Sequence, residues 1–151
     1  MKPNQLLLLP ALILLLGLSR TTAIAQNLPP LTAQEKADLQ QSRNYGFLAK
    51  EEKHIRGAWD TYQQLKNSGI TVRNFEVVAI GGVVKLITAE QELGRFIQEK
   101  SDGVFKVTVC KVAMNRLKVE EKDLPKAASV TSNAYIRLYQ LQAKQYLVIQ
   151  P

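Results

Sequence analysis

The chain has one cysteine and one histidine in 151 residues, and this scarcity excludes several kinds of chemistry. Because Cys110 is the only cysteine, the chain can form no internal disulfide, and it has no Cys-x-x-Cys pair for disulfide exchange. No group of His, Cys, Asp and Glu has the spacing of a metal site. The Gly-x-Gly-x-x-Gly pattern of dinucleotide-binding loops is missing too. We therefore expect no metal and no cofactor, and Cys110 is the best candidate for carrying chemistry.

Long apolar runs are missing except near the N-terminus. Residues 6–18 are almost wholly apolar and follow the positive charge of Lys2, and residues 23–25 match a small-x-small cleavage site. The run is shorter than the roughly 20 residues that a membrane-spanning helix needs. We expect a signal peptide over residues 1–25, cleavage before Gln26, a periplasmic location and no stable membrane span after cleavage. An uncleaved N-terminal anchor is the alternative.

A strong excess of one charge is also missing. Cleavage would leave 126 residues with 18 Lys and Arg against 13 Asp and Glu, a net charge of +5. The positive charges alternate with glutamates and form no basic stripe, which argues against nucleic acid as a partner. A chain of this length fits one domain. We expect a linker and short helix over residues 26–43 and an α/β domain over residues 44–151.

Strand and helix patterns alternate along this domain. The expected strands are 45–49, 75–80, 104–110, 128–131 and 145–149. Capping boxes at Thr32 and Thr88 are expected to start two of the helices. Helices are also expected over 54–67, 111–117 and about 133–143, the last with Tyr135, Leu138 and Tyr139 inward. Such alternation indicates an open, mainly parallel five-stranded sheet with helices on both faces.

Cys110 is predicted to lie where the third strand ends and a helix begins. Backbone N–H groups and the positive end of a helix dipole both favour a thiolate at such a junction. Ligands of open α/β sheets bind beyond the carboxyl ends of the strands, so Gly81, Gly82, Lys111 and Asn133 are candidate binding residues near the thiol.

Two further predictions concern the surroundings of the thiol. Lys106 and Thr108 would share its side of the strand, and these polar residues suggest a face that is partly solvated or lies against another subunit. His54 opens a charged helix and is expected to be a solvated surface residue. Trp59, Tyr62 and Tyr135 are expected to be core residues rather than parts of a ligand site.

Several segments together resemble the DsrE/DsrF-like (YchN-like) family over about residues 44–150. They are 75–83 (FEVVAIGGV), 107–110 (VTVC) with 113–117 after it, 121–124 (EKDL) and 146–149 (YLVI). The resemblance implies a flavodoxin-like fold and a homo-oligomer, either a trimer or a hexamer. It also implies that Cys110 carries a persulfide in a sulfur relay. Well-understood relay members are cytoplasmic and act beside partner subunits, whereas this chain is expected to be exported.

Two functions follow from these patterns. In the first, the Cys110 thiolate binds or relays sulfane sulfur and passes it to a thiol of a partner protein. In the second, the protein is a non-catalytic oligomeric binding or scaffold module of the cell envelope, and Cys110 is merely packed. The sequence leaves open whether the protein is an enzyme.

Overall fold

Five parallel strands form one sheet in the order β4-β3-β2-β1-β5 in the computed structural model, which describes residues 28–151. The expected signal peptide lies outside the described residues. The strands are β1 (Asn44–Ala49), β2 (Asn74–Ala79), β3 (Phe105–Cys110), β4 (Ala128–Thr131) and β5 (Leu147–Ile149). The helices are α1 (Ala33–Leu39), α2 (Glu52–Asn67), α3 (Glu92–Lys100), α4 (Lys111–Leu117) and α5 (Ala134–Ala143), with 3₁₀ turns η1 (Gly81–Ile87) and η2 (Glu121–Asp123).

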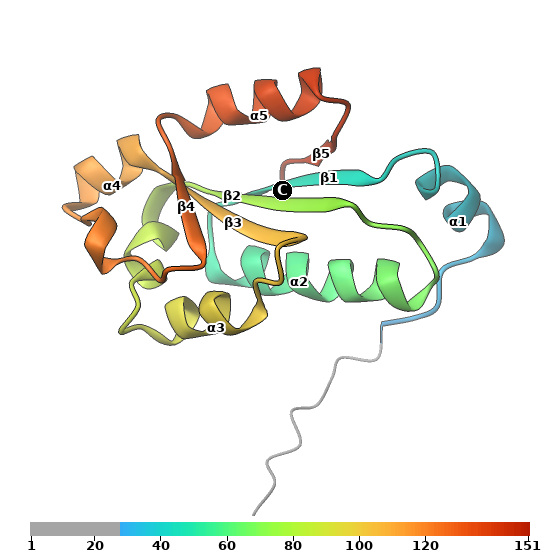
Figure 1. Ribbon diagram of the computed structural model, residues 1–151, viewed down its shortest axis with the longest axis horizontal. Coiled ribbons are helices and arrows are strands. Elements are labelled where there is room, and N and C mark those ends of the chain that lie inside the picture. Colours follow the sequence, from blue (N-terminus) through green and yellow to red (C-terminus); the bar gives the residue numbers. More distant parts are fainter. Residues whose placement is uncertain (1–27) are drawn as a thin grey trace, which may run out of the picture.

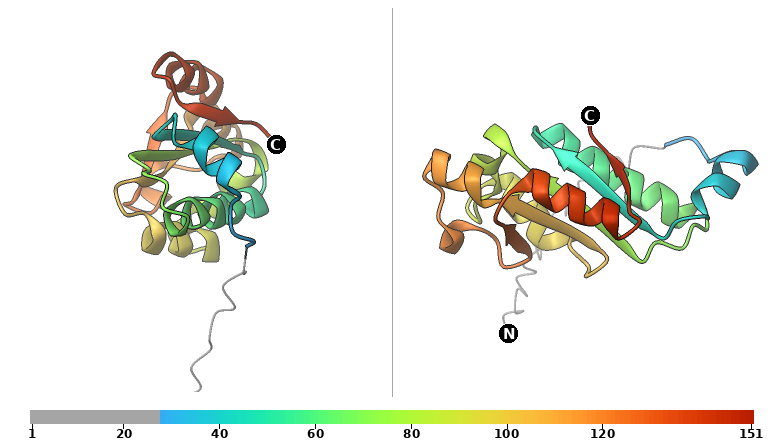
Figure 2. Two further views of the ribbon diagram at one scale, coloured as in Figure 1. Left: turned by 90° about the vertical axis from the view of Figure 1, so that its right-hand side faces the viewer. Right: turned by 90° about the horizontal axis from the view of Figure 1, so that it is seen from above.

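The helices cover the two faces of the sheet unequally. In the part of the chain that the structure describes, α2 and α3 lie on one face and α5 lies on the other (Figures 1 and 2). The chain moves from β1 to β4 in one direction and then returns from β4 to β5 across the sheet. Since parallel crossovers are right-handed, this reversal places α5 on the opposite face from α2. The predicted α/β class, with helices on both faces of a parallel sheet, is confirmed.

Aromatic side chains fill the face under α2 and α3. Phe75 on β2 and Phe105 on β3 stack with their ring centroids 5.7 Å apart, and Tyr62 of α2 lies 5.6 Å from Phe105. Trp59 meets Phe105 edge-on at 5.1 Å. The predicted core positions of Tyr62 and Trp59 are therefore confirmed, Trp59 being partly buried. Edge-to-face and offset contacts of this kind add to the gain from burial.

The capping box expected at Thr88 is wrong, whereas the one at Thr32 is confirmed. At the start of α1 the Thr32 N–H donates to the Glu35 carboxylate, and the Glu35 N–H donates to Thr32 Oγ1. Helix α3, in contrast, begins only at Glu92 and has no side-chain cap. The reason is that the Thr88 carbonyl group lies directly against Gly94 of α3. A Cβ atom at residue 94 would be only 1.9 Å from the Thr88 carbonyl oxygen. The backbone before α3 is thus held as a turn against the helix.

The orientation predicted for α5 is wrong for both tyrosines. Tyr135 is 53% exposed and Tyr139 is 69% exposed. The buried side of the helix is formed by residues spaced four and three apart: Ala134, Leu138 and Leu141. Arg137 is also directed inward because its guanidinium binds Glu76 of the sheet. This rotation sends the aromatic rings to the surface.

None of the helices described over residues 28–151 combines the length and apolarity needed to cross a membrane.

Candidate functional site

Cys110 is the last residue of β3, and α4 begins at the next residue, as the sequence predicted. The carboxyl ends of the parallel strands form one edge of the sheet, where α4, η1 and the start of α5 gather (Figure 1). At this edge the backbone N–H of Ala134, the first residue of α5, donates a hydrogen bond to Cys110 Sγ at 3.4 Å. The fold therefore places the thiol against the N-terminus of α5.

The expectation of a partly solvated thiol is wrong for the protomer. Cys110 is a free cysteine with only 1% of its surface exposed. Thr108, on the same side of β3, is buried as well, and only Lys106 near the start of the strand is exposed. The difference arises where α5 begins, because its first residue, Ala134, is itself fully buried and its N–H lies against Sγ. A reagent reaches the sulfur only if some part of the protomer moves.

The predicted binding residues lie at the same edge of the sheet as Cys110. The side chains of two of them, however, contact residues other than Cys110. The Lys111 ammonium forms an ion pair with Glu121. The Asn133 side chain caps α5, accepting a hydrogen bond from the Tyr135 N–H at 2.9 Å. Each contact supports local structure, the first by tying α4 to η2 and the second by starting α5.

Gly81 and Gly82 open η1 one residue after β2, the strand beside β3. Gly81 has φ +74°, a conformation that favours glycine, so its place in the sequence is explained by the backbone alone. Ala134 was not predicted as a contact of the thiol. The Asn133 cap and the neighbouring ends of β3 and β4 are the sequence signals that could have found it.

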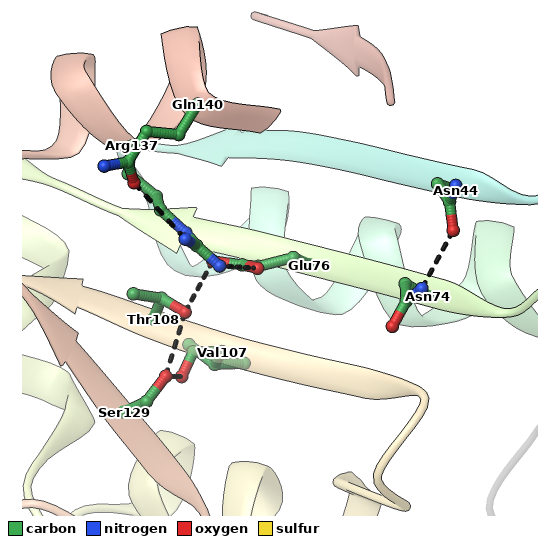
Figure 3. Close-up of polar contacts among 8 residues, drawn as sticks. All are labelled: Asn44, Asn74, Glu76, Val107, Thr108, Ser129, Arg137 and Gln140. Atoms are coloured by element: carbon green, nitrogen blue, oxygen red, sulfur yellow. Dashed lines mark hydrogen bonds and ion pairs between the residues drawn. The ribbon is translucent and has the colours of Figure 1, made fainter. Parts of the chain in front are cut away.

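A largely buried ion pair joins α5 to the middle of the sheet (Figure 3). It lies on the face of Thr108, and Cys110, two residues further along β3, is directed to the same face. Glu76 on β2 is only 4% exposed. Arg137 of α5 binds both of its carboxylate oxygens, with Nε–Oε1 and Nη2–Oε2 distances of 2.7 Å. Such two-point contacts between a planar guanidinium and a carboxylate fix orientation as well as charge.

Hydroxyl groups extend this pair across β3 to β4. Thr108 Oγ1 donates to Glu76 Oε1 at 2.8 Å, and Thr108 and Ser129 hydroxyls lie 2.9 Å apart. We call Glu76, Arg137, Thr108 and Ser129 the Glu76 network. Hydrogen bonding to Glu76 raises the pKa of Arg137, while burial lowers it less, so the guanidinium stays charged. A buried carboxylate without this partner would be costly, because desolvation would not be offset.

The Glu76 network was missed at the sequence level, although a signal exists. Glu76 interrupts an otherwise apolar strand of residues 75–80, and a buried carboxylate requires a cationic partner. The partner lies 61 positions away in the sequence, so only the fold identifies it as Arg137.

The remaining candidates lie outside this region. His54, expected to be solvated, is instead partly buried, with its side chain 16% exposed, and its Nδ1 accepts a hydrogen bond from the Lys50 N–H at 3.3 Å. Among residues 28–151 no cluster of three or more His, Cys, Asp or Glu could hold a metal ion. A groove of about 490 Å³ lies between α3 and residues 122–126, and Cys110 is not among its lining residues.

The chain belongs to the DsrE/DsrF-like family, whose model matches residues 45–151. Two solved structures share its fold. A protein of unknown function from Methanobacterium thermoautotrophicum, MTH1491, is 17% identical with a TM-score of 0.61, over 71% of this chain and 96% of that chain. A conserved protein of unknown function from Bacteroides thetaiotaomicron, BT1422, is 13% identical with a TM-score of 0.56, over 75% and 98% respectively. No curated protein is significantly similar to the chain.

Proposed function

We propose that the protein is an exported sulfur carrier in which Cys110 holds a sulfane sulfur as a persulfide and passes it to a thiol of a partner protein. The observation that carries this proposal is the position of the thiol. Cys110 ends a central strand at the ligand-binding edge of an α/β sheet, and its sulfur accepts a hydrogen bond from the first amide of α5. Membership of the DsrE/DsrF-like family supports the same role.

The carrier reaction needs only sulfur nucleophiles. The Cys110 thiolate attacks the outer sulfur of a donor persulfide or polysulfide. A bond forms between these two sulfurs, the S–S bond of the donor breaks, and the donor leaves as a thiolate. A partner thiolate then attacks the outer sulfur of the Cys110 persulfide and restores the Cys110 thiolate. The two steps balance without an external oxidant or reductant.

The N-terminus of α5 suits a negatively charged sulfur. Unpaired amides at the start of a helix carry partial positive charge and attract anions. The Ala134 amide already points at Sγ. After persulfide formation the outer sulfur would need further donors, and the backbone of Gly81 and Gly82 and the side chains of Lys111 and Asn133 are candidates, although Lys111 and Asn133 would first have to leave their present partners.

Mass spectrometry tests the carrier directly. Protein purified from its own compartment should carry an adduct of about 32 Da, one sulfur atom, that disappears on reduction. Cys110→Ser, the matched control, should lack the adduct. Wild-type protein that gains no reducible sulfur, either in the cell or on incubation with a polysulfide, would contradict the proposal.

A homo-oligomer in the periplasm is part of the proposal. The outer side of α5 exposes Tyr135, Ile136 and Tyr139, and the edge strand β5 exposes Leu147 and Ile149. The only charge of α5, Arg137, faces the sheet, so the outer side of the helix is uncharged. Exposed apolar surface of this kind favours contact with another chain. Light scattering of the cleaved chain should give a trimer or hexamer, and a monomer at high concentration would contradict this part.

The second candidate is a non-catalytic binding or scaffold module of the cell envelope. The burial of Cys110 and the uncharged, aromatic side of α5 favour it. The two functions separate in one comparison. If the protein is a carrier, Cys110→Ser should abolish its function in the cell. If it is a scaffold, Cys110→Ser should retain the function, and Tyr139→Lys should impair it more than Cys110→Ser does.

A further inference from the structure

The first turn of helix α5 lies against Cys110. The thiol is buried, and the amide that touches Sγ belongs to the first residue of this helix. Within residues 28–151, α5 is the helix that lies over this face of the sheet (Figure 1). Access to the sulfur from this side therefore requires the first turn of α5 to move.

An ion pair ties the first turn of α5 to the sheet. Arg137 lies one turn after Ala134, and its guanidinium makes both hydrogen bonds to Glu76. The apolar side of α5 is narrow and consists of Ala134, Leu138 and Leu141. Near its other end Leu141 packs over Gly46 of β1, where there is no side chain to interlock with it.

The anchor in the sheet is itself held rigidly. Glu76 accepts hydrogen bonds from Thr108 as well as from Arg137, and Thr108 lies two residues before Cys110 on the same side of β3. Figure 3 shows these side chains in one row from α5 to β4. One set of contacts thus fixes both the strand that carries the thiol and the helix that covers it.

We propose that the Glu76–Arg137 ion pair is a latch that keeps α5 closed over Cys110, and that the thiol reacts through local opening of this helix. The latch would regulate the Cys110 site of the proposed sulfur carrier, so its regulatory role rests on that proposed function. Its physical content, the control of access to Cys110, is measurable by itself. The closed state protects a sulfur adduct from other thiols, and the open state exposes it to a partner.

Alkylation of Cys110 in the folded protein tests the latch. Iodoacetamide should modify wild-type Cys110 slowly, and Arg137→Met should react at least tenfold faster. Arg56→Met is the matched control, because Arg56 also binds two carboxylates, Glu52 and Glu92, but on α2 on the other side of the sheet. The alkylation rate of Cys110 in Arg56→Met should stay within about twofold of wild type. The Arg56 ion pairs are exposed and contribute little to stability, so their loss should not open the helix over Cys110.

Low urea distinguishes local opening from global unfolding. Opening of α5 exposes little surface, so the alkylation rate should hardly change at urea concentrations below the unfolding transition. A rate that rises with the full urea dependence of unfolding would overturn the latch, and so would equal rates in Arg137→Met and wild type. Should Arg137→Met fail to fold, Glu76→Gln replaces it. This variant keeps an acceptor for Thr108 and should accelerate alkylation at least threefold, and an unchanged rate would overturn the latch.

The latch and the carrier fail separately. Fast alkylation in Arg137→Met, together with no sulfur adduct in wild type, would remove the carrier and keep the latch. A sulfur adduct in wild type, together with equal alkylation rates, would do the reverse.

Discussion

The two faces of the sheet are built from different chemistry. Under α2 and α3 the core is apolar and aromatic, with Phe75, Phe105 and Tyr62 in mutual contact. Under α5 the sheet presents Glu76, Thr108 and the buried thiol of Cys110, and a single helix covers them. One sheet thus carries a nonpolar side and a side with buried polar groups.

The difference teaches where stability and function lie in this fold. Burial of aromatic rings contributes the free energy of folding without demanding particular partners. A buried ion pair contributes little net stability, since the desolvation of both charges offsets their attraction. What the Glu76–Arg137 pair supplies instead is a fixed position for α5. A cover over Cys110 on the polar face can therefore move at a lower cost in free energy than a helix packed on the aromatic face.

The largest expected effect is on the aromatic face. Phe105→Ala should lower the free energy of unfolding by about 3–5 kcal/mol, because it removes a fully buried ring from the centre of the cluster. Urea denaturation measures the change. A loss below about 1 kcal/mol would show that the aromatic contacts are not the main source of stability, and the contrast between the faces would fail.

A double-mutant cycle on the Glu76–Arg137 pair should give the next largest effect. With Glu76→Gln and Arg137→Met we expect a coupling of about 2 kcal/mol in the free energy of unfolding, because each single change leaves a buried group without its partner. The matched cycle of Glu92→Gln and Arg56→Met should give about 0.5 kcal/mol or less, since Glu92 is exposed. Equal couplings would mean that the buried pair has no special role.

Acid should weaken the aromatic face through Asp102, which precedes β3. Burial raises the pKa of Asp102, but hydrogen bonds from the Phe105 N–H, the Tyr62 hydroxyl and the Val104 N–H lower it further than burial raises it, with help from Lys66. The folded state thus favours the carboxylate, and this contribution exists above the unfolded pKa of about 3.9. It is lost as pH falls through the lower pKa of the folded state.

Asp102→Asn measures this contribution. The variant should be less stable than wild type at about pH 6, and the difference between their urea midpoints should shrink by about pH 3. A difference that is constant over this range would show that the ionised carboxylate is not what stabilises the start of β3.

The smallest effect on folding is expected at Tyr139. Because this side chain is exposed, Tyr139→Lys should change the free energy of unfolding of the protomer by about 0.5 kcal/mol or less. It should nevertheless dissociate the proposed oligomer, as light scattering would show. An intact oligomer would place the subunit contact elsewhere than on α5.

Much of the aromatic face and the edge position of Cys110 could be predicted from sequence. Strand patterns such as residues 75–80 and the cap at Asn133 are local signals, and they located β2 and α5 closely. The burial of Cys110 could not be predicted in this way, because it depends on where α5 lands after crossing the sheet. The same holds for Glu76 and Arg137, which become partners only through that crossing.

The prediction of which side of α5 faces the sheet was wrong for a related reason. Apolar periodicity favoured Tyr135 and Tyr139 as core residues, since it gave a polar Arg137 no reason to face the sheet. Once Glu76 is known to be buried opposite the helix, the ion pair decides the rotation. A charged residue inside an apolar strand therefore indicates an oppositely charged partner on the helix that covers it.

Native-state hydrogen exchange tests the difference between the faces most directly. The account predicts that the amides of Leu138 and Leu141 in α5 exchange through a local opening, with a free energy well below that of Val77 and Val107 in the sheet. Arg137→Met should lower the protection of the α5 amides more than that of the strand amides. Equal protection of helix and strands in the wild type, falling together in the variant, would contradict a cover that opens separately over Cys110.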